Sequence, residues 1–353
     1  MKLLHCADVH LGSAFERFDP KVRLARKAEL RATFDRMVNY AASSGASAVL
    51  ICGDLFDVAR PSMEDKRFFY SKVRLNPDLN FYYLRGNHDT EEGFDEPLPN
   101  LFTFGEGITE YELGDVRIAG CEISFLEKVY TDYNPAPDRV NILMLHGQLV
   151  DGGSSGGAET IYKNRLENKN LSYLALGHIH SYSSVQLGGG VAVYPGCLEG
   201  RGYDETGEHG FVMIDIDGDR VTHEFVPCAR RTIFKTEVDL TGTANVEEAI
   251  AKISAEAGAS PENMMRIILK GEVPYSPEDA VLETRARLSG SFFDLSVKNE
   301  AKQAYDLTSL EKNVTLRGEF YRVVMADAGI PAEKKEEVIR LGLRLLDGEV
   351  AGL

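Results

Sequence analysis

The sequence predicts an α/β protein, and two observations lead to this fold class. Short continuous apolar runs alternate with segments of helical periodicity through the N-terminal two thirds of the chain. Such runs between helices are typical of buried parallel strands. The pattern then changes near residues 227–231, where a shorter series of strand and helix patterns begins. We therefore expect a large α/β domain followed by a smaller α+β domain.

The elements of the first domain can be justified in chain order. Residues 20–45 place apolar side chains at helical spacing and end at Gly45, which predicts a long helix. Residues 114–124 alternate as a half-buried strand does, and two later segments predict hairpins, the second turning on Asp217-Gly218. The continuous apolar runs that predict buried strands are 48–52, 81–84, 142–145 and 173–176.

The remaining third of the chain predicts a different arrangement. Its strand patterns cover 233–240, 264–270 and 293–297, and its helical patterns cover 245–257 and 276–288. Two further helical segments, 314–328 and 331–346, close the chain. We expect three parts, which are a main domain of residues 1–230, an α+β capping domain of residues 231–300 and a C-terminal helical hairpin within 301–353.

Composition restricts the classes of protein that remain. A net charge of -16 over 353 residues counts against a large non-specific DNA footprint. No apolar stretch approaches the roughly 20 residues that cross a membrane, and the N-terminus lacks a signal-peptide pattern. The five cysteines are odd in number and far apart, which favours a reducing compartment. We expect a cytoplasmic protein without a membrane partner.

Metal-ligating side chains follow the strands at the points where the strands end. In a parallel sheet these ends share one edge, so five segments would deliver carboxylate, imidazole and amide groups to one rim. Five of the eight histidines of the chain lie at these ends. The residues at the five strand ends are Asp8 and His10, then Asp54, then Asn87, His88 and Asp89, then His146, and finally His178 and His180.

This set of side chains favours a two-metal site. Imidazole, carboxylate and amide ligands without a thiolate suit Mn²⁺, Fe or Zn²⁺ more than Ca²⁺ or copper. Seven ligands are too many for one ion and fit two divalent ions that share a bridging anion. Asp54 is the candidate for that bridge. The two ions would be bridged by this carboxylate and by a solvent oxygen.

The order of these motifs resembles that of a known superfamily. The segments "DVH", "GDLFD", "GNHD", "HG" and "GHIH" span residues 8–180 and are similar, in this order, to the calcineurin-like metallophosphoesterases. The segments "LHCADVHLG" and "YPGCLEGRGYDETGEHG" resemble its DNA-repair exonuclease branch, which includes the SbcD-like and YhaO-like proteins. The resemblance implies a two-sheet β-sandwich flanked by helices, with a smaller C-terminal α+β capping domain.

The resemblance also implies a role for each site residue. The first metal ion is expected at Asp8, His10, Asp54 and His180, and the second at Asp54, Asn87, His146 and His178. His88 is expected to contact the scissile phosphate as general acid or transition-state stabiliser, with Asp89 orienting it. Mn²⁺ is the expected metal, with Fe, Zn²⁺ or Mg²⁺ as alternatives. Some relatives have His where this chain has Asp57, whose role is left open.

The expected partners are DNA and an SbcC-like coiled-coil ATPase, which would dock on the C-terminal hairpin. Dimerisation is usual in that family, so a homodimer is a further expectation. Three basic residues near the motifs, Arg60, Arg85 and Arg201, are candidates for contacts to substrate phosphates.

Three functions remain open from the sequence. The leading one is a Mn²⁺-dependent nuclease that acts on DNA in repair together with the ATPase. The second is a phosphatase or small-molecule phosphodiesterase of the same superfamily, which the acidic balance of the chain keeps in view. The third is a non-catalytic scaffold for the ATPase, although every predicted ligand and His88 are present.

Overall fold

The computed structural model describes residues 1–58, 60–89, 97–105, 107–153, 157, 159–304 and 307–346. Within it the chain divides into two compact units. The first consists of Met1–Lys235, Ser260–Arg266 and Phe292–Asp294, and the second of Thr236–Ala259, Ile267–Ser291 and Leu295–Leu353. The division into three parts with boundaries at 230 and 300 stays a prediction.

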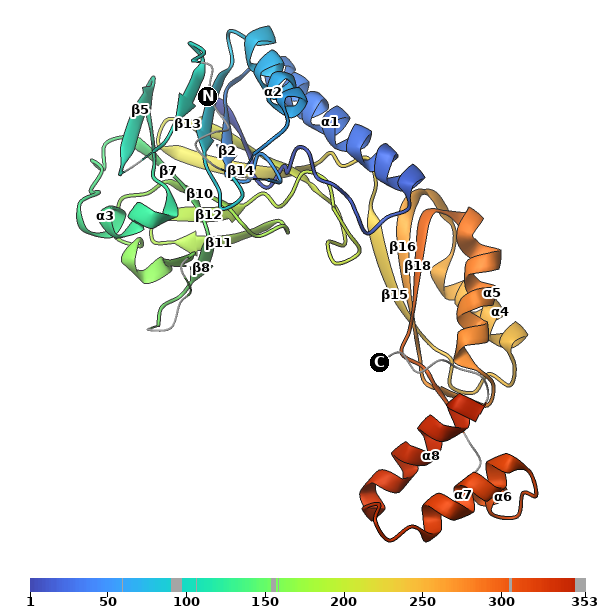
Figure 1. The fold of residues 1–353 in the computed structure, drawn as a ribbon. Helices are drawn as coiled ribbons and strands as arrows, with labels where there is room; N and C mark the ends of the chain where they lie inside the picture. Colours follow the sequence, from blue (N-terminus) through green and yellow to red (C-terminus); the bar gives the residue numbers. More distant parts are fainter. Residues whose placement is uncertain are drawn as a thin grey trace. The chain divides into compact units, whose positions relative to one another are not determined.

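The first unit is built on two six-stranded sheets, which confirms the expected fold class (Figure 1). The first sheet has the order β14-β13-β1-β2-β3-β4. Strands β1 to β4 run parallel, whereas β13 and β14 form an antiparallel hairpin that extends the sheet beyond β1. The strands are β1 (Lys2–Cys6), β2 (Ala46–Cys52), β3 (Asn80–Leu84), β4 (Leu101–Thr103), β13 (Gly210–Asp217) and β14 (Arg220–Pro227).

The second sheet has the order β11-β12-β10-β7-β6-β5, with a parallel centre and an antiparallel strand at each edge. The predicted strands at 48–52 and 142–145 therefore exist, but they belong to different sheets. An apolar run does not show which sheet it joins, so this division could not be read from periodicity. The strands are β5 (Thr109–Leu113), β6 (Val116–Gly120), β7 (Val140–His146), β10 (Tyr173–Gly177), β11 (Ser183–Leu187) and β12 (Gly190–Tyr194).

Apolar side chains that point alternately to the two faces of the central strands explain why the two sheets stack. In β2, Ala48, Leu50 and Cys52 face the second sheet and pack with Ile142 and Met144 of β7. The intervening side chains face the opposite way, so β2 is apolar on both faces. Both sheets share this property, and each needs a second covering layer.

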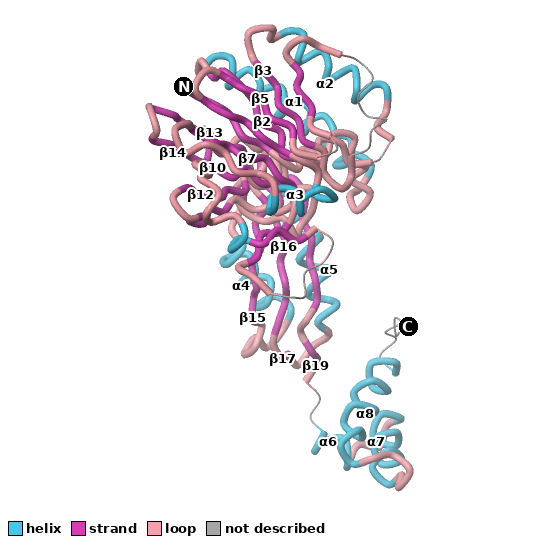
Figure 2. Tube along the Cα trace, turned by 90° about the vertical axis from the view of Figure 1, so that its left-hand side faces the viewer, coloured by secondary structure: helices cyan, strands magenta, loops and turns pink. Residues whose placement is uncertain are grey.

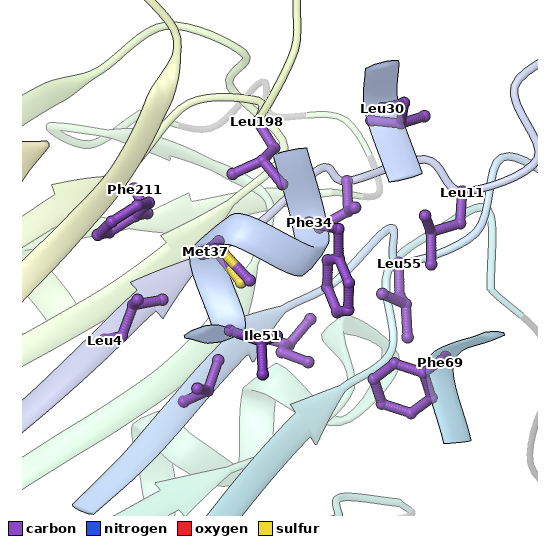
Figure 3. Close-up of a cluster of buried hydrophobic side chains, with 14 of the residues drawn as sticks. Leu4, Leu11, Leu30, Phe34, Met37, Ile51, Leu55, Phe69, Leu198 and Phe211 are labelled. Atoms are coloured by element: carbon purple, nitrogen blue, oxygen red, sulfur yellow. The ribbon is translucent and has the colours of Figure 1, made fainter. Parts of the chain in front are cut away.

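Helices supply the outer cover of the first sheet. The long helix α1 (Pro20–Ser43) confirms the periodicity prediction, and α2 (Met63–Leu75) lies near it (Figure 1). Phe34 and Met37 of α1 pack among Ile51 and Leu55 in one buried cluster (Figure 3). A separate cluster covers the other side of the second sheet and includes Leu126 of α3 (Leu126–Thr131).

The segments between the strands of the second sheet contain short secondary-structure elements. A 3₁₀ turn at Ile123–Phe125 leads into α3, and another occupies Lys163–Arg165. The two short strands β8 (Gln148–Val150) and β9 (Thr160–Tyr162) pair parallel to one another.

The second unit contains most of a small three-stranded sheet in the order β15-β16-β18. Two helices, α4 and α5, lie together on one side of it (Figure 1), and Figure 2 shows its strands side by side. The predicted strand and helix order after residue 232 is thus confirmed. The elements are β15 (Ile233–Asp239), α4 (Val246–Ala257), β16 (Ser260–Lys270), β17 (Glu272–Val273), α5 (Pro277–Leu288), a 3₁₀ turn at Ser289–Ser291, β18 (Phe292–Asn299) and β19 (Lys302–Gln303).

The chain continues into a helical hairpin, as its periodicity predicts. Helices α6 (Leu307–Glu311), α7 (Leu316–Ala326) and α8 (Ala332–Leu346) share a small core, in which Ile339 and Leu343 are buried. No described helix combines the length and the apolar character that crossing a bilayer requires.

Candidate metal centre

The predicted site residues follow the carboxyl ends of five parallel strands. Asp8 and His10 come after β1, and Asp54 comes after β2. The third motif follows β3 of the first sheet, His146 is the last residue of β7 in the second sheet, and His178 and His180 follow β10 of that sheet. The rim is therefore shared by two stacked sheets, rather than being the edge of a single sheet.

A first group of ligand atoms comes from Asp8, His10 and His180. One atom of each lies within 4.8 Å of the others. Nε2 of His180 lies 3.8 Å from Oδ1 of Asp8. All three side chains belong to the predicted first metal site, and the structure brings them together.

A second group consists of Asp8, Asp54 and His146, again with ligand atoms within 4.8 Å of one another. Nε2 of His146 is 3.6 Å from Oδ2 of Asp54 and 2.9 Å from Oδ1 of Asn87. The same Asp54 oxygen is 3.9 Å from Nε2 of His10. Asp54 thus stands between a histidine of each predicted site, which is where a bridging carboxylate belongs.

His178 lies beside the second group. Its ring centroid is 5.5 Å from that of His146, and its backbone N–H donates to both oxygens of Asp8 at 3.1 and 3.0 Å. Nδ1 of His178 is 3.7 Å from Oε2 of Glu159. Sequence reasoning missed Glu159, which follows a Gly/Ser-rich segment whose residues 154–156 and 158 lie outside the described part of the chain.

The backbone at the rim is strained at the predicted ligands themselves. Asp8, His10, Asp54 and His178 have φ values of 50°, 52°, 50° and 98°. Residues with side chains enter this left-handed region rarely and at a cost of about 1–3 kcal/mol. Only two other non-glycine residues in the described chain share the property. Strain concentrated on the predicted ligands indicates that the positions of these side chains, and not the most favourable backbone conformation, determine the structure of these loops.

Glycines allow the strand ends to approach one another. Gly53 has φ of 85°, and a Cβ there would overlap Nδ1 of His146. A Cβ at Gly86 would overlap the carboxylate of Asp54. The glycines of "GDLFD" and "GNHD" are therefore required by close packing inside the site.

The buried polar atoms at the rim fit divalent cations. Nε2 of His10 is buried and has no hydrogen-bond partner in the described chain, which costs free energy unless a ligand binds it. Burial and the neighbouring Asp54 raise the pKa of Asp8 well above its usual range. Burial also lowers the pKa of His146 to about 4, so its ring is neutral near pH 7. Neutral imidazoles and closely placed carboxylates match the donor set of a two-metal site.

His88 lies at the mouth of this centre and is exposed. Its backbone N–H donates to Oδ1 of Asp54 at 2.9 Å, and its ring centroid is 5.2 Å from that of His10. The carboxylate of Asp89 instead accepts from the backbone of Leu55 and Phe56, after β2, and of Gly86, after β3. Asp89 thus joins two motif loops, and its predicted role in orienting the His88 ring stays a prediction.

The three basic residues that were predicted to contact phosphates have different surroundings. Arg60 is exposed beyond the second motif. Arg85 donates from Nε to Glu122 at 2.7 Å, beside a cavity of about 310 Å³ that also reaches Asn87 and His146. Arg201 donates to Asp57 at 2.7 Å.

Sequence reasoning missed Glu205, which contacts the predicted ligand His180. Its Oε1 lies 2.7 Å from Nδ1 of His180, and the backbone N–H of Arg201 donates to its Oε2 at 2.6 Å. Burial would raise the pKa of Glu205, but the hydrogen bonds from His180 and Arg201 lower it to about 2. Residue 205 lies in the "YPGCLEGRGYDETGEHG" segment. An acidic side chain in that segment was the feature of the sequence that could have identified it.

Comparisons with known proteins agree with this geometry. Residues 1–182 match the family model described as calcineurin-like phosphoesterase. The chain is 26% identical over 348 residues to the uncharacterized metallophosphoesterase YhaO of Bacillus subtilis, an alignment that covers 88% of this chain and 84% of that one. It is 27% identical over 296 residues to the DNA double-strand break repair protein Mre11 of Sulfurisphaera tokodaii. This alignment covers 77% of this chain and 74% of that one.

A shorter match has higher identity. One component of the nuclease SbcCD from Rhodobacter capsulatus is 33% identical over 109 residues, which cover 30% of this chain and 25% of that protein.

Proposed function

This chain belongs to the calcineurin-like phosphoesterase family, and from that premise we propose that it is a dimetal-dependent nuclease that hydrolyses DNA phosphodiesters during repair. Family membership makes it a hydrolase of phosphoester bonds. The observation that carries the finer proposal is the position of Asp54, within 3.9 Å of His10 and 3.6 Å of His146. One carboxylate between two imidazoles supports two neighbouring metal sites.

The residues that would hold each ion are those of the two metal sites that the family resemblance implies. Asp8, His10, Asp54 and His180 would hold the first, and Asp54, Asn87, His146 and His178 would hold the second. When bound, such divalent ions acidify water and offset the negative charge that grows on phosphoryl oxygens. We propose Mn²⁺ as the metal, because imidazole and carboxylate ligands without thiolate suit it.

His88 is the chain's own candidate for proton transfer. It is exposed at the mouth of the centre, yet its backbone is fixed by the hydrogen bond to Asp54. An imidazole in this position can contact a phosphoryl oxygen and donate a proton to the leaving sugar oxygen. Asp89 supports it indirectly, because it holds the loop of His88 against the loop that follows β2.

The names of the relatives support DNA as the substrate. One relative is a DNA double-strand break repair protein, and another is part of a nuclease. The alignment covers 74% of the first relative, so the likeness extends well beyond the catalytic motifs. Since the net charge of this chain is -16, we propose that much of the DNA affinity comes from bound metal ions and from a partner.

We propose an SbcC-like coiled-coil ATPase as that partner, docked on the helical hairpin. Helices α7 and α8 bury one apolar face against each other but leave other large apolar side chains in solvent. Helical partners commonly bind such a face. The exposed apolar side chains are Leu316, Val323, Met325, Leu341, Leu345 and Leu346. A homodimer is also part of the proposal, on the family resemblance alone.

Hydrolysis of a smaller phosphodiester is the second candidate, and the acidity of the chain favours it. Strong negative charge weakens binding of a polyanion more than that of a small ester. The described cavity beside Asn87 and His146, of about 310 Å³, is large enough for a small ester group.

One experiment separates these functions. The purified chain is incubated with Mn²⁺, Mg²⁺ or EDTA and with end-labelled single- and double-stranded DNA or bis(p-nitrophenyl) phosphate. We expect Mn²⁺-dependent cleavage of DNA. Cleavage of the small ester alone would favour the second candidate. Absence of any cleavage, with the metal ions bound, would favour a non-catalytic scaffold for the ATPase.

A further inference from the structure

Beside the predicted ligands His10 and His180 lies a charged network whose members are not themselves predicted metal ligands. Arg201 donates from Nη1 to Oδ1 of Asp57 at 2.7 Å. On its other side, Nη2 is 3.5 Å from Oε1 of Glu205, while the backbone N–H donates to Oε2 at 2.6 Å. We call Asp57, Arg201 and Glu205 the outer network.

Each carboxylate of the outer network contacts the outer nitrogen of one predicted ligand. Oε1 of Glu205 is 2.7 Å from Nδ1 of His180, and Oδ1 of Asp57 is 3.1 Å from Nδ1 of His10. The second contact is short enough for a hydrogen bond but is not aligned as one. Both carboxylates accept hydrogen bonds, so these contacts favour the tautomer that carries its proton on Nδ1. Nη2 of Arg201 also lies 3.4 Å from Nδ1 of His180, but the contact with Glu205 is shorter, at 2.7 Å, and decides the tautomer.

The other nitrogen of each ring faces the metal-binding carboxylates. Nε2 of His180 lies 3.8 Å from Asp8, and Nε2 of His10 lies 3.9 Å from Asp54. With the proton on Nδ1, the lone pair on Nε2 is free for an ion. A histidine held from behind by a carboxylate is the usual arrangement in metalloproteins, and it raises both the basicity and the order of the ligand.

The segment that carries the outer network is itself anchored in the core of the first unit. Glu199 is fully buried and accepts from Arg26 at 2.8 Å and from Thr33 at 2.5 Å, both on α1. Arg26 also donates to the carbonyl of Gly200 at 2.9 Å. Arg201 and Glu205 therefore project from a firmly held segment, so they can fix the rings of His10 and His180.

A direct role of Arg201 in binding phosphate fits these contacts less well. Its guanidinium already lies between two carboxylates. The adjoining cavity of about 370 Å³ is lined by four acidic side chains and two basic ones, which disfavours a polyanion there. The acidic residues are Glu16, Asp57, Asp204 and Glu205, and the basic ones are Arg17 and Arg201.

We propose that Asp57, Arg201 and Glu205 are positioning residues that hold His10 and His180 in the tautomer and orientation required by the first metal ion. The inference rests on the proposed two-metal function and assigns this chain's Asp57 a role. Arg201 connects the other two residues, because its positive charge holds the like-charged carboxylates of Asp57 and Glu205 together. Each carboxylate can then stay beside Nδ1 of its histidine. Loss of any member is expected to weaken the first metal site while sparing the second.

The test measures Mn²⁺ binding to the full chain by calorimetry and by the electron paramagnetic resonance signal of free Mn²⁺. Glu205→Gln and Asp57→Asn each neutralise one of the two carboxylates beside Arg201. If one variant folds poorly, the other still tests the inference. We expect affinity at one of two sites to fall about 10- to 100-fold in each variant. Arg201→Lys keeps a positive charge without the planar fork and is expected to retain part of the affinity.

Asp204→Asn is the matched control, because Asp204 lies in the same segment but pairs with Arg17 and Arg266 away from the ligands. Its Mn²⁺ affinities should equal those of the wild type. Unchanged affinities in Glu205→Gln and Asp57→Asn, or an Arg201 variant that raises only the KM for phosphodiester, would overturn the inference. If the wild type itself bound no Mn²⁺, the proposed function would fail instead, so the two failures are distinguishable.

Discussion

His88 differs in exposure from two of the predicted ligand histidines, although all of them lie at one rim. His10 and His146 are buried, whereas His88 is exposed, although its backbone N–H donates to Asp54 and its ring lies edge-on to that of His10. The sequence alone predicts that all of them gather, because each follows a strand end. It could not separate a solvent-facing histidine from a buried one, since the separation depends on how the loops after β2 and β3 pack.

His88→Ala should therefore retain metal and lose turnover. Removal of a general acid typically reduces the rate about 10²- to 10⁴-fold. We expect kcat to fall by that factor while Mn²⁺ stoichiometry stays at the wild-type value. Both are measured on one preparation, with His223→Ala on β14 as the control histidine. Loss of Mn²⁺ from His88→Ala would make His88 a ligand or a structural residue.

His5 provides a pH prediction for stability. Its ring is fully buried between the Tyr173 hydroxyl at 3.0 Å and the Leu176 carbonyl at 3.2 Å, and burial lowers its pKa to about 3. The unfolded chain takes up a proton on this ring below about pH 6.5, whereas the folded chain does not. Stability that is present above pH 6.5 is therefore lost as the pH falls toward 3.

At pH 5 this single histidine is expected to cost about 2 kcal/mol of unfolding free energy relative to neutral pH. Urea unfolding of metal-free protein at pH 7.5 and pH 5 measures the loss. His5→Asn should show a smaller difference between the two pH values, because its side chain does not titrate. An equal difference in both proteins would mean that His5 does not carry the effect.

At the scale of the elements, the sequence predicted most strands and helices but not their layers. The run at 48–52 became β2 and that at 142–145 became β7, within a few residues at each end. Their assignment to separate sheets depends on long-range packing, such as Leu50 against Ile142. Glu205 was missed for the same reason, because its contact with His180 spans a loop whose path periodicity does not encode.

The loop after β2 allows a prediction about glycine. In Gly53→Ala the new Cβ would overlap the His146 ring and would sit at φ of 85°. Gly45 has φ of 72°, but no atom lies within 4 Å of the position that a Cβ would take there, so Gly45→Ala isolates the backbone strain. That strain is about 1–2 kcal/mol.

We expect Gly45→Ala to lower the free energy of unfolding by that amount and to bind Mn²⁺ normally. Gly53→Ala should be destabilised further and should lose affinity at the metal site that contains His146. Urea unfolding and Mn²⁺ titration of the two variants provide the comparison. Full Mn²⁺ binding by Gly53→Ala would show that the rim tolerates a wider separation than its packing implies.

At the scale of the whole molecule, we propose that the first unit carries out hydrolysis and that the second unit binds the partner. All predicted metal ligands belong to the first unit, whereas the helical hairpin belongs to the second. Leu341 and Leu345 of α8 are 48% and 50% exposed, although Leu343 between them is buried. Such an exposed apolar face is unusual on a surface helix and favours a binding role.

Leu341→Asp combined with Leu345→Asp should abolish capture of an SbcC-like ATPase in a pull-down while the Mn²⁺-dependent hydrolysis of a small ester is unchanged. Charged side chains at a helical interface are strongly unfavourable because they must be desolvated. Leu282→Asp on α5 is the matched control, since Leu282 is also exposed, at 63%, but lies outside the hairpin. Equal capture by the double variant and the wild type would place the ATPase elsewhere.

The central claim is that the rim of the two sheets holds two divalent ions through a shared Asp54. Counting Mn²⁺ per chain by elemental analysis after removal of loosely bound metal tests it most directly, with Asp54→Asn measured in parallel. We predict two ions per wild-type chain, and fewer than two in the variant together with loss of phosphodiester hydrolysis. Hydrolysis by a wild-type chain that holds one ion or none, or two ions retained in Asp54→Asn with full activity, would contradict the account.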